Sequence, residues 1–144
     1  MNPDPVIVVA GIIHSADGRY LICRRSPHLV EGGKWEFPGG KVQAGESLQE
    51  ALRRELREEL HLEVDVGHEI GRVSFTTGTQ DFVLVGLESK AEPTDVTLTV
   101  HSAFRWATGS ELREFDFASA DLPFLPKLRH SQTGKLGFSN PPSK

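Results

Sequence analysis

The sequence predicts an α/β (α+β) fold, an α/β/α sandwich around a mixed β-sheet, and three observations support this. Apolar runs of strand length, separated by turn residues, recur through most of the chain. An amphipathic helix interrupts them at 47–62, and a second helical segment is expected at 122–129. Helices on either side of a group of strands bury their apolar faces against a sheet. We expect one domain over 1–130 and a flexible polar tail over 131–144.

The elements follow from the local pattern. The first run is apolar throughout, which indicates a strand buried on both faces, and a turn at 15–18 joins it to the next strand as a hairpin. Ser110 is expected to begin a helix of about two turns, and Asp121 could cap the last helix. The expected strands lie at 6–13, 19–25, 62–66, 70–77, 80–88, 96–100 and 104–107, with a short extended piece at 35–37.

The composition is that of an ordinary soluble globular protein, and it excludes several classes. The net charge of −4 argues against a nucleic-acid polymer as the main partner. No apolar run approaches the roughly 20 residues of a membrane span, and no signal peptide precedes the first strand. The single cysteine, Cys23, excludes an internal disulfide and suits a reducing compartment. We therefore expect a cytoplasmic protein without a membrane partner, either a monomer or a homodimer.

The helix at 47–62 carries acidic residues on its apolar face. Ser47 and Glu50 form a capping box, and leucines at 48, 52 and 56 recur at helical spacing. At about 100° per residue, Glu55 and Glu59 lie within about 20° of the first of these leucines. Two carboxylates therefore interrupt the apolar stripe, and Glu58 lies on its edge.

This placement is unfavourable unless a cation accompanies it. Unpaired charges on a buried face are costly, and like charges four residues apart repel each other. A divalent cation such as Mg²⁺ or Mn²⁺ removes both problems, because these ions prefer carboxylate oxygens. The alternative is a solvated acidic face paired with Arg53, Arg54 and Arg57. That alternative suits Glu58, but it does not suit Glu55 or Glu59.

The spacing of the glycine, glutamates and arginine resembles a known motif. Gly40, Glu46 and the run Arg54-Glu55-Leu56-x-Glu58-Glu59 match the Nudix box, in which five and then seven residues separate the fixed positions. The preceding Trp35-Glu36-Phe37-Pro38-Gly39-Gly40 is similar to the MutT branch, the nucleoside triphosphate pyrophosphohydrolases. The last glycine of the pattern is His61 here. We expect a slightly different helix exit from this change, and a metal-ligand role for His61 is the weaker alternative.

The resemblance implies the same sandwich fold and a small-molecule nucleotide substrate. It implies Mg²⁺, with Mn²⁺ as a substitute, held by Glu55, Glu58, Glu59 and the carbonyl of Gly40. It also implies that Glu46 pairs with Arg54 and thereby orients the helix glutamates. Arg25 is the better phosphate contact of two adjacent arginines, although a surface arginine is an equal alternative.

One feature of the MutT-type relatives is missing. They bring a further glutamate from the segment before the last strand, whereas 96–110 contains no Asp or Glu. His101 is the nearest titratable group, and Glu59 itself could take the proton. The general base is therefore unassigned, and packing is the alternative role for His101.

Three further residues are candidates for the nucleotide pocket. Asp121 lies where MutT relatives place a residue that reads the base edge, and helix capping explains it equally well. Phe37 could line the base or pack in the core, and Asp81 could meet a base or sugar or be an exposed strand end. Hydrolysis of ADP-ribose or another nucleoside diphosphate sugar is an alternative function, as is a nucleotide-binding module without turnover.

Overall fold

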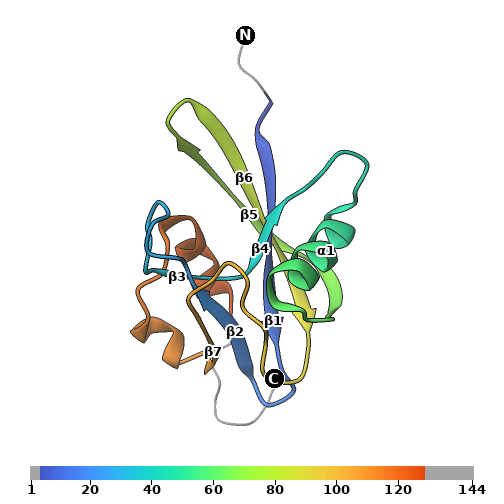
Figure 1. Ribbon diagram of the computed structural model, residues 1–144, viewed down its shortest axis with the longest axis vertical. Helices are drawn as coiled ribbons and strands as arrows, with labels where there is room; N and C mark the ends of the chain where they lie inside the picture. Colours follow the sequence, from blue (N-terminus) through green and yellow to red (C-terminus); the bar gives the residue numbers. More distant parts are fainter. Residues whose placement is uncertain (1–3, 129–144) are drawn as a thin grey trace.

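The computed structural model describes residues 4–128, in which seven strands form one mixed sheet with segments packed on both faces (Figure 1). The order along the sheet is β3-β2-β1-β6-β5, while β4 pairs with β1 and β7 pairs with β2. β1 and β6 run parallel and every other pair runs antiparallel, which confirms the predicted mixed sheet. The strands are β1 (Val6–His14), β2 (Arg19–Arg24), β3 (Trp35–Glu36), β4 (Gly39–Lys41), β5 (Asp65–Thr77), β6 (Gln80–Lys90) and β7 (Ala103–Thr108).

One face of the sheet is covered by α1 (Leu48–Leu60). Side chains alternate along β1, so Val9 and Ile13 pack toward α1 while Ala10 and Ile12 pack on the opposite face. Leu52 and Leu56 are fully buried in this layer. Each buried leucine contributes about 2 kcal/mol, so the apolar stripe of α1 fixes the side of the helix that meets the sheet.

The opposite face is covered by two 3-10 helices, η1 (Glu111–Glu114) and η2 (Ser119–Lys127). The prediction of α-helices here was wrong in type, and Ser110 makes no capping bond within the described chain. Pro123 and Pro126 lie inside η2, where each lacks the N–H that an α-helix needs. The predicted helix end beyond residue 128 and the tail at 131–144 lie outside the described residues.

The predicted strand at 96–100 was also wrong. This segment crosses the end of α1, where the N–H groups of Thr97 and Thr99 donate to the carbonyls of Leu60 and Glu59, both at 3.1 Å. Val96 and Leu98 pack on the core beside α1. The alternation of apolar residues and threonines therefore arises because one side of this segment faces the core, and not because the segment is a strand. The segment therefore satisfies carbonyl groups that every helix leaves unpaired at its end.

The two strands predicted at 62–66 and 70–77 are replaced by the single strand β5. Its register against β6 shifts on either side of Glu69, which explains the interrupted pattern. None of the helices in residues 4–128 is long and apolar enough to cross a membrane.

Candidate active site

The position of α1 is set at both of its ends. Ser47 accepts a bond from the N–H of Glu50 at 3.0 Å, and its own N–H donates to the Glu50 carboxylate at 2.8 Å, which confirms the capping box. At the other end His61 adopts φ 53 and ψ 40, and its N–H donates to the carbonyl of Arg57 at 3.1 Å. His61 thus takes the left-handed conformation that glycine adopts most easily. The helix therefore ends at this position with His61 in place of glycine.

The glycines of β4 make room for Glu55. A Cβ atom added to Gly40 would lie 2.3 to 2.6 Å from the carboxylate atoms of Glu55. A Cβ added to Gly39 would instead lie 1.8 Å from the carbonyl oxygen of Val9, in the adjacent strand β1. Glycine at position 39 therefore allows β4 to lie close to β1, and glycine at position 40 allows the Glu55 carboxylate to lie close to β4.

Arg54 organises the acidic residues around it. Its guanidinium donates to both carboxylate oxygens of Glu46, at 2.7 and 3.0 Å, so the pairing expected from the resemblance is present. The same group donates to the carbonyl of Lys41 at 2.9 Å, to Glu55 at 3.1 Å and to Glu58 at 3.3 Å. One arginine therefore holds the β4–α1 loop and two of the three helix glutamates together.

Glu59 is the most perturbed group of the helix. Burial raises its pKa well above the ordinary range, and the adjacent Glu55 carboxylate raises it further because it accepts a hydrogen bond from the protonated form of Glu59. Its Oε1 is buried and has no hydrogen-bond partner among residues 4–128. Buried oxygens are almost always paired, so this atom marks a position where a positive charge or a donor would be stabilised.

Glu58 differs from the other two glutamates. Its side chain is 60% exposed and turns toward Arg54. Within the described part of the chain no three acidic, histidine or cysteine side chains are already arranged around a common metal position.

Glu36 is a residue of this site that sequence reasoning did not select. Its carboxylate lies between Arg25, whose Nη1 donates at 2.7 Å, and the Nε2 of His101 at 2.9 Å. Its charge contributes to the raised pKa of Glu59. The available signal was strand alternation: Glu36 pairs across β2–β3 with Cys23, which packs on the α1 side of the sheet.

His101 reaches this site on the segment that crosses the end of α1. Its side chain is only 4% exposed, and its Nδ1 is buried without a partner in residues 4–128. His101 is therefore packed in the interior and also lies beside the Glu36 carboxylate of the site. Cys23, also buried nearby, is not a reactive thiol, because burial and the neighbouring Glu36 and Glu59 raise its pKa far above the usual range.

Asp121 and Phe37 meet on the other face of the sheet. Asp121 lies within η2, so it is not the cap that the sequence suggested, and its Oδ2 accepts the N–H of Phe37 at 2.9 Å. Burial raises the pKa of Asp121 to about 7. The ring of Phe37 is buried against Phe117, with ring centroids 5.4 Å apart, which corresponds to its core alternative.

The structure does not bring Asp81 to the glutamates. Its carboxylate accepts the hydroxyl of Thr76 at 2.7 Å near the tip of the β5–β6 hairpin. The next residue, Phe82, pairs with Val6 of β1, whereas Gly40 pairs with Val9. The two positions on β1 are three residues apart. At about 3.3 Å per residue this separates Asp81 from the level of Gly40 by roughly 10 Å or more.

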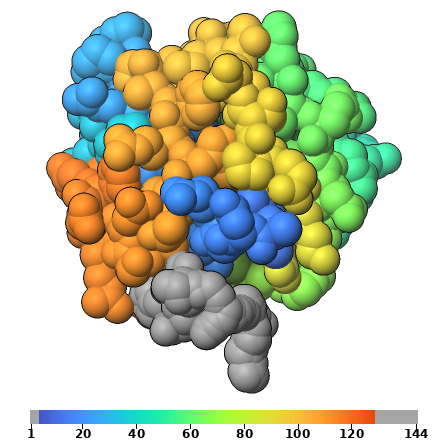
Figure 2. All heavy atoms as spheres, turned by 90° about the horizontal axis from the view of Figure 1, so that it is seen from below, coloured from blue at the N-terminus to red at the C-terminus, as the bar shows by residue number. Residues whose placement is uncertain are grey.

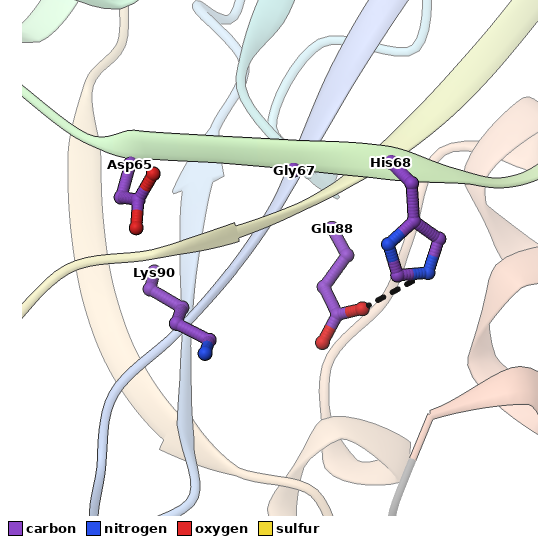
Figure 3. A pocket seen from close by; sticks show the side chains of 5 residues that line it. All are labelled: Asp65, Gly67, His68, Glu88 and Lys90. Carbon is purple, nitrogen blue, oxygen red and sulfur yellow. Dashed lines mark ion pairs between the residues drawn. The ribbon is translucent and has the colours of Figure 1, made fainter.

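A separate open hollow of about 230 Å³ lies on the β5–β6 hairpin (Figure 3). Glu88 is at its centre, with one carboxylate oxygen 3.4 Å from the Nε2 of His68 and the other 2.9 Å from the Nε2 of His14. Both oxygens are engaged by side chains of the sheet, and α1 contributes no residue to the lining. The lining residues are Asp65, Gly67, His68, Glu88 and Lys90.

Comparison with known proteins shows the family of this chain. The sequence matches the NUDIX domain over residues 4–128. It is 38% identical over 137 residues to "Putative 8-oxo-dGTP diphosphatase 2" of Mycobacterium tuberculosis, covering 89% of this chain and 91% of the relative. It is 35% identical over 118 residues to the CTP pyrophosphohydrolase of Escherichia coli, covering 82% and 87%.

Solved structures show the same fold. The solution structure of the Escherichia coli ORF135 protein has a TM-score of 0.75 at 33% identity, covering 85% of this chain and 87% of that one. The crystal structure of a MutT protein from Methanosarcina mazei has a TM-score of 0.78 at 26% identity, covering 88% and 95%. The chain therefore belongs to the Nudix family, and it is a hydrolase of the MutT-like group that acts on nucleotides.

Proposed function

We propose that this chain hydrolyses nucleoside triphosphates to a nucleoside monophosphate and pyrophosphate in the presence of Mg²⁺, with Mn²⁺ as a substitute. Oxidised or modified deoxynucleotides such as 8-oxo-dGTP are the candidate substrates. The observation that carries the proposal is the half-buried Glu55–Glu59 pair. Within residues 4–128 the buried Oε1 of Glu59 has no hydrogen-bond partner, and the cation bonded to Glu55 is Arg54.

The residues present fit a divalent cation. Glu59 offers an unpartnered buried oxygen, and Gly40 leaves open the space in which a side chain would collide with Glu55. Glu55, Glu58, Glu59 and the Gly40 carbonyl would hold the ion, since hard cations select oxygen ligands. When bound, such an ion neutralises phosphate charge and lowers the pKa of an attacking water.

The protein contributes orientation and proton transfer. Arg54 fixes the carboxylate of Glu55 through a bond of 3.1 Å, while Glu46 fixes Arg54. Arg25, which follows β2 and is ion-paired with Glu36, is the candidate phosphate contact. Glu59 and His101, whose Nδ1 has no hydrogen-bond partner within residues 4–128, are the two candidates to accept a proton from water.

The base end of the site is rich in hydrogen-bond acceptors. Asp121 accepts the N–H of Phe37 at 2.9 Å, and Phe37 directly follows Glu36, so both acidic residues lie at β3. Carboxylates accept bonds from exocyclic amines, which guanine- and cytosine-type bases carry. Two similar proteins are named for an oxidised guanine nucleotide and for CTP, which supports this class of base.

A substrate panel tests the proposal. Ordinary and oxidised nucleoside triphosphates, together with ADP-ribose, are incubated with Mg²⁺, and the products are identified by chromatography. We expect pyrophosphate and a monophosphate from at least one triphosphate, and loss of turnover by orders of magnitude in Glu58→Gln with the fold intact. Turnover of ADP-ribose alone would favour the nucleoside diphosphate sugar alternative, and tight nucleotide binding without products would favour a binding module.

A further inference from the structure

The first residue of η2 is capped from a distant part of the chain. The residue before it, Ala118, has no side-chain acceptor, so the first N–H of the helix lacks a local partner. Glu31, in the loop between β2 and β3, supplies one from 88 positions earlier. A single oxygen of its carboxylate accepts the N–H of Ser119 at 2.9 Å and the Ser119 hydroxyl at 2.8 Å. We call this pair of bonds the Glu31–Ser119 clamp.

The backbone of the loop is shaped around Glu31. Its φ is 55°, a conformation that residues with a Cβ adopt only where the surrounding structure requires it. A Cβ on the following Gly32 would lie 2.4 Å from the carbonyl oxygen of Pro27, so the chain is tightly folded back on itself. The carbonyl of Glu31 also accepts the N–H of Lys34 at 3.2 Å, which closes the turn.

The clamp connects two candidate nucleotide contacts, the phosphate contact Arg25 and the base contact Asp121. Ser119 lies two residues before Asp121 in η2. On the loop side, the Nε of Arg25 donates at 2.9 Å to the carbonyl of Val30, the neighbour of Glu31. Arg25 donates to the Glu36 carboxylate at 2.7 Å, and the N–H of the next residue, Phe37, donates to Asp121 at 2.9 Å. Arg25 and Asp121 are therefore both attached to neighbouring residues of the chain at β3. Figures 1 and 2 both place this loop beside the segment that carries η1 and η2.

A second set of bonds attaches the same segment to β3. The N–H of Trp35 donates to the carbonyl of Asp116, and its carbonyl accepts the N–H of Ala118, both at 2.9 Å. These bonds hold the segment before η2, whereas the clamp holds its first residue. Removing the clamp therefore leaves the sheet and α1 intact while it frees the loop from η2.

We propose that Glu31 is a positioning residue that fixes the β2–β3 loop against η2 and so sets the separation of Arg25 and Asp121 for a bound nucleotide. This rests on the proposed function, since it assigns both residues to the same ligand. Within residues 4–128 the carboxylate of Glu31 bonds to Ser119 and Lys34 and not to the helix glutamates, so the chemical step is unaffected. The clamp acts on nucleotide affinity.

Steady-state kinetics on the preferred triphosphate separate this role from a merely structural one. In Glu31→Ala we expect KM to rise about tenfold with kcat within about twofold, because bonds to a charged acceptor are lost. Glu31→Gln keeps an acceptor oxygen and should restore KM to within about threefold of the parent. Glu92→Ala removes an equally negative, exposed side chain elsewhere and should change neither constant. An unchanged KM in Glu31→Ala, or a Glu31→Gln variant as impaired as Glu31→Ala, overturns the proposal.

Two measurements on the full chain do not depend on turnover. Amide hydrogen exchange without nucleotide should accelerate at 117–122 in Glu31→Ala and remain unchanged in α1, whereas equal exchange in parent and variant overturns the clamp itself. Calorimetry with the nucleoside monophosphate product should show about tenfold weaker binding in Glu31→Ala. If the parent neither binds nor hydrolyses any nucleotide, the proposed function fails and the positioning role fails with it, while the exchange result still decides whether the clamp exists.

Discussion

Replacing either of the adjacent glycines of β4 by alanine adds one methyl group, and we expect one replacement to reduce activity and the other to reduce stability. A Cβ atom added at Gly39 or at Gly40 would collide with another part of the protein, but the atoms it would meet differ between the two positions. At Gly40 the obstacle is the carboxylate of Glu55, the far end of a flexible side chain. At Gly39 the obstacle is the backbone of Val9 in β1. We predict that Gly40→Ala folds normally and loses activity, while Gly39→Ala is strongly destabilised.

The magnitudes follow from the contacts. In Gly40→Ala the closest approach is 2.3 Å, so the Glu55 carboxylate must move by about 1 Å to reach an ordinary contact. Its bond with Arg54 is then weakened, which costs about 1 kcal/mol of stability. A displacement of 1 Å in a positioned group can reduce turnover about 100-fold.

In Gly39→Ala the closest approach is 1.8 Å to a backbone oxygen. Relief requires β4 to separate from β1, which breaks ladder bonds on both sides of the glycine, including that from Gly11 N–H to the Pro38 carbonyl at 2.7 Å. Two or three such bonds lost from the interior correspond to about 3 to 5 kcal/mol.

Urea unfolding and pyrophosphate release measure the two effects on the same preparations. We expect Gly40→Ala to unfold within about 1 kcal/mol of the parent with about 1% of its turnover. Parent-like turnover in Gly40→Ala would show that Glu55 needs no fixed position. A Gly39→Ala protein as stable as the parent would show that the β1–β4 contact is looser than the structure indicates.

Three further predictions concern single residues. Glu46→Gln keeps one acceptor for Arg54, so kcat should fall about tenfold without being abolished, and a parent-like kcat would remove Glu46 from the orienting network. His61→Gly relieves the left-handed conformation at the end of α1 and should raise the free energy of unfolding by about 0.5 to 1 kcal/mol in urea; a loss of stability would contradict this. Asp121 keeps its proton to a pH of about 7 when folded, because burial raises its pKa from 3.8, and the unfolded chain releases it near pH 4. Stability from this group is therefore present below pH 4 and declines as pH rises to about 7, by up to about 4 kcal/mol. Asp121→Asn still accepts the N–H of Phe37 and should remove this decline, whereas parallel stability profiles of variant and parent between pH 4 and 8 would refute it.

Local patterns predicted the parts of the site that depend on neighbours in sequence. The capping box of Ser47 and Glu50 and the inward direction of Glu55 and Glu59 follow from helical geometry alone, and the Glu46–Arg54 pair follows from the motif. These features involve residues at most eight positions apart, over which the conformation of the chain is nearly determined by its sequence.

Other parts depend on residues that meet only in the fold. Glu36 meets His101 across 65 positions, and Glu31 meets Ser119 across 88, so neither partner could be identified by spacing. The alternation at 96–100 was mistaken for a strand because a segment lying across a helix end also has an inward and an outward side. The helix expected at 122–129 contains Pro123 and Pro126, and two prolines within the nine residues of η2 favour a 3-10 helix over an α-helix.

The central claim is that carboxylates are tolerated on the inward side of α1 because they hold a divalent cation together. Anomalous diffraction from crystals soaked in Mn²⁺ tests it most directly. We expect a strong peak between the carboxylates of Glu55 and Glu59 and the carbonyl of Gly40, with Glu58 rotated away from Arg54 to join them. The absence of any peak there, with Glu58 still bound to Arg54 at saturating Mn²⁺, would contradict the account.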